Sequence, residues 1–121
     1  MAALALQDFR SHLDGVVAAV PIAPVLVAAD DVAGDEFDRA DEHTYLAVRN
    51  PTGGAIDVTF TITSECDFGV SHALTVTVAP AADPAQPAQL VGPFNRSRFA
   101  ASAPIVLAYS GPGLEVGAVR L

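Results

Sequence analysis

The residues with the clearest potential for chemistry are seven carboxylates crowded into residues 30–42, half of the chain's 14 acidic residues. They are Asp30, Asp31, Asp35, Glu36, Asp38, Asp41 and Glu42. Carboxylate oxygens suit Ca²⁺, but this spacing does not fit an EF-hand loop, which needs alternating oxygen ligands, Gly sixth and Glu twelfth. Like charges this close repel one another, so we expect a solvated loop. An ion site or a contact with a basic partner is the alternative.

The histidines do not form a metal site or a catalytic pair by spacing. None of His12, His43 and His72 belongs to a His-x-x-x-His pair or stands beside a cysteine at ligand spacing. Two of them directly follow a serine, and adjacent side chains in a strand point to opposite faces, which rules out a Ser-His dyad there. We therefore expect surface or edge histidines.

The single cysteine, Cys66, excludes an internal disulfide and a multi-cysteine metal site. Its neighbours Glu65 and Asp67 disfavour a thiolate, so we interpret it as a structural thiol. The sequence contains no Gly-rich phosphate loop, Walker motif or GxSxG elbow. The glycosylation sequon Asn95-Arg96-Ser97 is a pattern that arises often by chance. These observations predict a protein that is not an enzyme and holds no cofactor or metal.

The charge balance argues against two classes of partner. The chain has 6 basic residues, all of them arginines, and a formal net charge of −8. Binding to nucleic acid or to an anionic membrane needs a basic surface, and Arg96 and Arg98 beside Phe94 and Phe99 are too few to supply one. The apolar run 16–29 is too short to span a bilayer, contains two prolines, and lacks the net positive start of a signal peptide.

The elements that must position any site begin with residues 1–29, which we expect to form an N-terminal arm. Apolar side chains recur there at helical spacing: Leu6, Phe9, Leu13, Val16, Val17 and Val20. Gly15 is a stop signal, so the spacing predicts a short helix over 4–14 followed by an extended apolar segment over 16–29. A short helix is marginal alone in water, so its apolar face must dock on its own domain or on a neighbour.

The pattern of apolar residues in 43–121 predicts a strand-rich domain, which follows the acidic loop of residues 30–42. In 55–63, Ile56, Val58 and Phe60 alternate with polar residues, as in a strand with one buried face. The other predicted strands are 43–50, 72–79, 89–91, 104–110 and 114–121. Short strands at this spacing predict an all-β fold, an antiparallel β-sandwich or a small jelly roll with the N-terminal arm attached.

Several of these segments together resemble a family of small virion proteins encoded among the head genes of tailed bacteriophages and prophages. The resemblance lies in Thr44-Tyr45-Leu46-Ala47-Val48-Arg49-Asn50 with its following Gly turn and strand, and in Val91-Gly92-Pro93-Phe94. It continues in Val106-Leu107-Ala108-Tyr109-Ser110, in residues 114–121, and in the opening Leu4-Ala5-Leu6-Gln7-Asp8. The acidic loop and the Pro/Ala loop lie outside it.

This resemblance implies a structural protein on the exterior of the virion, most simply a capsid decoration (cement) protein that binds the major capsid protein. Such proteins are homo-oligomers, often trimers. The partner-binding residues that we predict are Leu4, Leu6, Phe9, Leu13, Val16, Val17, Val20 and Phe94. One alternative is a neck, head-completion or tail-associated protein, and another is a carbohydrate-binding or adhesive β-sandwich.

Overall fold

The computed structural model describes residues 2–9, 23–37, 43–65, 71–81, 87–94 and 104–121, and no helix occurs in these ranges. The first five strands are β1 (Ala2–Ala3), β2 (Leu6–Asp8), β3 (Val27–Ala28), β4 (Asp35–Phe37) and β5 (Thr44–Arg49). The other five are β6 (Ile56–Glu65), β7 (Ser71–Val78), β8 (Gln89–Val91), β9 (Ile105–Tyr109) and β10 (Glu115–Arg120). The all-β prediction is confirmed for the described residues.

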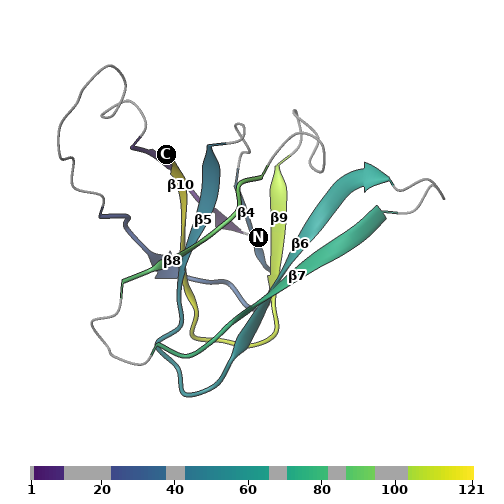
Figure 1. Cartoon of the computed structure of the whole chain (residues 1–121). Coiled ribbons are helices and arrows are strands. Elements are labelled where there is room, and N and C mark those ends of the chain that lie inside the picture. Colours follow the sequence, from purple (N-terminus) through teal and green to yellow (C-terminus); the bar gives the residue numbers. More distant parts are fainter. Residues whose placement is uncertain (1, 10–22, 38–42, 66–70, 82–86, 95–103) are drawn as a thin grey trace.

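The strands form two five-stranded sheets in a β-sandwich-like arrangement (Figure 1). One sheet has the order β1-β4-β9-β6-β7, and the other has the order β2-β10-β5-β8 with β3 also paired to β10. Most pairs are antiparallel, but β1 runs parallel to β4, and β2 runs parallel to β10. The sandwich is therefore mixed rather than purely antiparallel.

The antiparallel pairs follow a simple rule along the chain. Strands β3, β4, β5 and β6 pair in turn with β10, β9, β8 and β7. Successive pairs alternate between the two sheets, and the pairs β5·β10 and β6·β9 then join them within each sheet. The chain is thus one long antiparallel ribbon that is folded over into two layers.

The core lies between the two sheets. In β6, apolar residues that face this core alternate with polar residues that face outward. Val58 and Phe60 are fully buried, whereas Thr59 is half-buried and Thr61 is exposed, as the sequence pattern predicts. Phe94 lies at the centre of an aromatic cluster, with its ring centroid 5.5 Å from that of Phe37 and 5.1 Å from that of Phe60. These distances are typical of favourable edge and tilted aromatic contacts.

The predicted N-terminal helix is wrong for the described residues, because residues 2–9 contain two strands. The amide of Leu4 donates to the carbonyl of Glu36 at 2.7 Å, and that of Phe9 donates to the carbonyl of Arg120 at 2.9 Å. A single short helix gains little in water, whereas these strands add to edges that already exist and gain sheet hydrogen bonds and burial. Residues 10–14 of the expected helix lie outside the described residues.

The acidic stretch also differs from the expected solvated loop. Within residues 30–37 it forms a turn and then β4, which lies between β1 and β9. Asp35 and Phe37 are buried at 1% and 2% exposure. Oδ2 of Asp35 accepts two hydrogen bonds, which offset part of the cost of removing the carboxylate from water, whereas the buried Oδ1 accepts none from the described residues. Residues 38–42 lie outside the described residues.

Candidate interaction surface

The structure places four of the predicted partner-binding residues, and its own core uses two of them. Leu4 and Phe94 are buried at 8% and 2% exposure. Leu6 is half-buried and packs against the same core, and Phe9 is half-buried at the end of the N-terminal segment. The remaining four, which are Leu13, Val16, Val17 and Val20, lie outside the described residues. In this conformation the side chains of Leu4 and Phe94 are covered by their own chain.

A side-chain clamp at Gln7 holds two N-terminal segments together. Its amide Nε2 donates to the carbonyl of Val25 at 2.8 Å, and its Oε1 accepts from the amide of Val25 at 2.7 Å. A primary amide thus satisfies both polar groups of one backbone residue, as a neighbouring strand would. The clamp fixes the segment that leads into β3 beside β2, although the two are 18 residues apart in sequence.

Gly117 lies where β10 changes partner on this edge. Glu115 and Val116 pair with β3, whereas Ala118 and the residues that follow pair with β2. A Cβ atom at position 117 would lie 2.7 Å from the carbonyl oxygen of Val25 and 3.1 Å from Nε2 of Gln7. Glycine therefore allows the clamp to approach the strand closely.

Next to the clamp, the surface is hollowed by a cavity of about 330 Å³. Its lining includes Ala3, Ala5, Gln7, Val25, Val27 and Gly117. Val25 and Val27 are 69% and 48% exposed, so apolar side chains border the hollow and face solvent. Cavities with mostly apolar walls and a few polar groups are the usual form of binding sites. We call this area, residues 3–7 and 25–27 with Gly117, the N-terminal surface.

A buried carboxylate and a half-buried phenol form a pair that connects the acidic stretch to β9. The Tyr109 hydroxyl donates to Oδ2 of Asp35 at 2.7 Å, and the amide of Asp30 donates to the same oxygen at 3.1 Å. Burial raises the pKa of the Tyr109 phenol above its usual value, and the hydrogen bond to Asp35 and the negative charges of Asp35 and Asp30 raise it further. The phenol therefore acts as a hydrogen-bond donor at neutral pH.

Asp30 organises the turn that precedes β4. Its Oδ1 accepts from the amides of Val32 and Ala33 at 3.2 and 3.0 Å, and its carbonyl accepts from the amide of Gly34 at 2.8 Å. The hydrogen bond from the Ala33 amide is the main cause that lowers the pKa of the Asp30 carboxyl. This aspartate therefore has a structural role in the turn.

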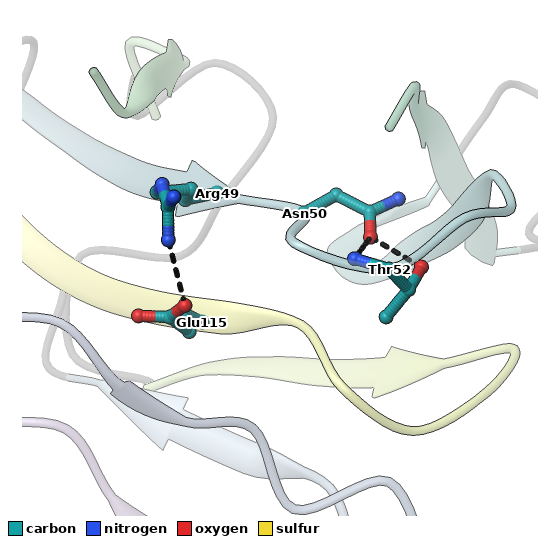
Figure 2. Close-up of polar contacts among 4 residues, drawn as sticks. All are labelled: Arg49, Asn50, Thr52 and Glu115. Carbon is teal, nitrogen blue, oxygen red and sulfur yellow. Dashed lines mark hydrogen bonds and ion pairs between the residues drawn. The ribbon is translucent and has the colours of Figure 1, made fainter. Parts of the chain in front are cut away.

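Asn50 forms a polar junction where β5 ends (Figure 2). Its side chain is buried and uses all four of its hydrogen-bonding positions. Nδ2 donates to the carbonyls of Gly54 at 2.8 Å and Val78 at 3.0 Å. Oδ1 accepts from the amide and the hydroxyl of Thr52 at 3.0 and 2.6 Å. One residue thus joins the β5–β6 turn to the end of β7.

Figure 2 also shows an ion pair between neighbouring strands, in which Nη1 of Arg49 lies 3.0 Å from Oε1 of Glu115. The two residues are directly opposite in the β5·β10 register. Their side chains are 20% and 36% exposed, so water screens the attraction. The pair reinforces the register and offers no catalytic group.

The other chemistry-bearing residues do not converge on a site within the described part of the chain. No group of three or more His, Cys, Asp and Glu side chains in that part could hold a metal ion. The carbonyl of His43 accepts from the amide of Leu121 at 2.8 Å, a backbone contact. His12, Cys66 and the segment from Asn95 to Phe99 lie outside the described residues, as does the side chain of His72.

Comparisons with known proteins found no relative of this chain. No protein-family model matches the chain, and no curated protein or solved structure does either. Among the described residues, no helix is long and apolar enough to cross a membrane.

The sequence analysis did not predict the Gln7 clamp or the Asn50 junction. Local sequence signals exist for Gly117 and Asn50 but not for Gln7. Gly117 interrupts a run of strand-forming residues, and a glycine inside a strand often marks a close backbone approach. Asn50 precedes Pro51, which marks a turn but does not reveal contacts with residues far along the chain. Nothing local in the sequence pairs Gln7 with Val25.

Proposed function

We propose that the chain folds as a small jelly roll and serves as a structural virion protein of a tailed bacteriophage. The observation that carries the fold is the folded ribbon, in which four antiparallel strand pairs alternate between two sheets. Eight strands in two sheets, connected in this order, are the jelly-roll arrangement, which viral capsid proteins and lectins use. Fold does not fix function, so the virion role rests on the fold together with the resemblance described above.

The specific role that we propose is that of a decoration protein, without catalytic activity, that binds the major capsid protein on the outside of the head. A protein that binds the assembled shell and not its free subunits stabilises the shell by mass action. Contacts to several subunits, or by several linked copies, would strengthen this effect through effective concentration. The N-terminal surface supports the proposal. Its hollow is bordered by exposed valines, and contact with an apolar partner would remove these side chains from water.

Location in the virion is the first thing to measure. Immunogold labelling of virions from the phage or prophage that encodes this chain, with an antibody against it, should decorate the head regularly. Labelling of the neck or tail would instead support the runner-up, a head-completion or tail-associated protein. Absence of labelling, with glycan binding by the purified protein, would support an adhesive jelly roll.

Shell binding tests the N-terminal surface directly. We expect Val25→Asp to reduce co-sedimentation with expanded shells, because a charge would have to be desolvated on contact. Val32→Asp is the matched control, since Val32 is 92% exposed on the turn before β4 and outside the cavity lining. Equal binding by both variants would contradict this docking surface but not the location of the protein on the head.

A further inference from the structure

Strand β7 ends its sheet with a long edge that carries no acidic residue, lysine or arginine. On one side it pairs with β6 in regular register from Ala73 to Val78, and no described strand pairs with its other side. Its eight residues, Ser71–Val78, include no Asp, Glu, Lys, Arg or Pro. Soluble proteins usually protect such edges with charges, prolines, bulges or short strands. Along Ala73–Val78, β7 has none of these protections.

The core-facing side of β7 is only partly covered. Leu74 and Val76 are half-buried and pack against the core, whereas Val78 is 3% exposed. On the opposite face, Thr75 and Thr77 are exposed. A further strand with apolar residues at alternate positions would cover Leu74 and Val76 and leave the threonines in water.

The sequence of β7 is itself complementary to such a strand. We propose that β7 is a dimerisation edge, at which the β7 strand of a second copy of this chain adds antiparallel with Thr75 opposite Thr75. In this register Leu74 of each copy lies opposite Val76 of the other, and Ala73 lies opposite Thr77. The same surface serves both copies, so the interface closes with twofold symmetry and does not propagate.

The absence of acidic residues makes this edge a favourable place for two copies to meet. A chain with a net charge of −8 repels its copies in most orientations. Apart from His72 near its start, β7 contains no ionisable acid or base, and neither does the part of β6 from Val58 to Ser64. The nearest acid along β6, Asp57, lies one strand inward and accepts a hydrogen bond from Thr77 at 2.6 Å. The repulsion between copies is therefore small where the Ala73–Val78 parts of their β7 edges meet.

The experiment compares two lysine variants by analytical ultracentrifugation of the full chain. Thr75→Lys places two ammonium groups opposite one another at the proposed twofold axis, and we expect the dimer dissociation constant to rise about tenfold or more. Thr59→Lys is the matched control, because Thr59 lies opposite Thr75 one strand inward. Their hydroxyls are 3.1 Å apart, so each variant loses the same hydrogen bond. We expect Thr59→Lys to dimerise like the unmodified chain.

A cross-link tests the register. In a Cys66→Ala background, Thr75→Cys should form a disulfide-linked dimer on mild oxidation, and Thr59→Cys should not, because directly opposite strand residues bring their Cβ atoms within bonding range. A monomeric or trimeric unmodified chain, a Thr75→Lys variant as dimeric as the control, or a Thr75→Cys variant that does not cross-link would each overturn the proposal. A dimer that fails to bind shells would leave this inference intact and contradict only the proposed function.

Discussion

Tyr109 on β9 donates its phenolic hydrogen to the carboxylate of Asp35 on β4 across 2.7 Å, although the two residues are 74 positions apart. The register explains the contact, because Asp35 lies opposite Leu107, and Tyr109 follows on the same face two residues further along β9. The pair is therefore one of the links that hold the acidic stretch against the sheet.

Removal of this hydrogen bond should destabilise the fold. We expect Tyr109→Phe to lower the free energy of unfolding at pH 7 by about 1.5–3 kcal/mol, the usual range for a hydrogen bond to a charged group. Urea denaturation measures the difference. Tyr45→Phe, on strand β5 of the other sheet, is a control in which the same hydroxyl is removed from a half-buried site.

The raised pKa of Tyr109 predicts a loss of stability at high pH. In the unfolded chain the phenol ionises near its ordinary pKa of about 10, whereas in the folded chain it stays protonated to higher pH. The stabilisation is therefore complete below pH 10 and is lost as the pH rises above it, by up to about 1.4 kcal/mol per pH unit. Urea midpoints measured from pH 8 to 11 should fall more steeply for the unmodified chain than for Tyr109→Phe. Parallel curves would contradict the assignment.

Asn50 should be among the most sensitive polar residues. Asn50→Ala leaves the carbonyls of Gly54 and Val78 without their side-chain donor, so we expect a loss of about 3 kcal/mol in unfolding free energy. Asn50→Asp should not rescue it, because a carboxylate cannot donate to a carbonyl. Thr52→Ala, which removes the hydroxyl that donates to Oδ1 of Asn50, should cost about 1 kcal/mol. Thermal unfolding followed by circular dichroism would rank the three variants.

A methyl group at position 117 should separate the N-terminal clamp from β10. Gly117→Ala forces the Val25 carbonyl or the Gln7 amide to move, and we expect a cost of about 1–3 kcal/mol. Faster amide hydrogen exchange in residues 25–28 would localise the effect. Gly53→Ala, where an added methyl meets no atom within 4 Å, should change stability little or raise it slightly.

The ion pair of Arg49 and Glu115 should contribute little. A double-mutant cycle with Arg49→Met and Glu115→Gln should give a coupling energy of about 0.5 kcal/mol, because both side chains are partly exposed. Repeating the cycle in 1 M NaCl should reduce the coupling further. A coupling above about 2 kcal/mol would show that the pair is less screened than its exposure indicates.

Phe94 should behave as a core residue and not as a contact residue. Phe94→Ala removes the ring that contacts both Phe37 and Phe60, and we expect a loss of about 3–5 kcal/mol. Leu90→Ala is the control, because Leu90 is 51% exposed on β8, and it should change stability by less than about 0.5 kcal/mol. Equilibrium unfolding in urea compares them.

The strands from β5 onward could be predicted closely because their signals are local. Residues 89–91 were predicted as a strand with the same bounds as β8, and the predicted strand 104–110 contains β9 at Ile105–Tyr109. Alternating apolar residues bounded by Gly and Pro turns describe a half-buried strand whatever its neighbours are. The same local reasoning gave a wrong prediction for the N-terminal segment. Its apolar spacing fits a helix, and the strands with which it pairs, β4 and β10, are far away in sequence.

By itself the sequence determined that the chain builds a two-layer β fold, because the period of two in its apolar residues leaves one face of each strand to be buried. Only the tertiary structure decided where the N-terminus lies, that Asp35 is buried, and that Gln7 clamps Val25. Each of these depends on a contact between residues distant in the chain, in which a neighbouring backbone or a hydroxyl supplies the missing hydrogen bond. Such partners come together only after the ribbon has folded over, so no local pattern of residues specifies them.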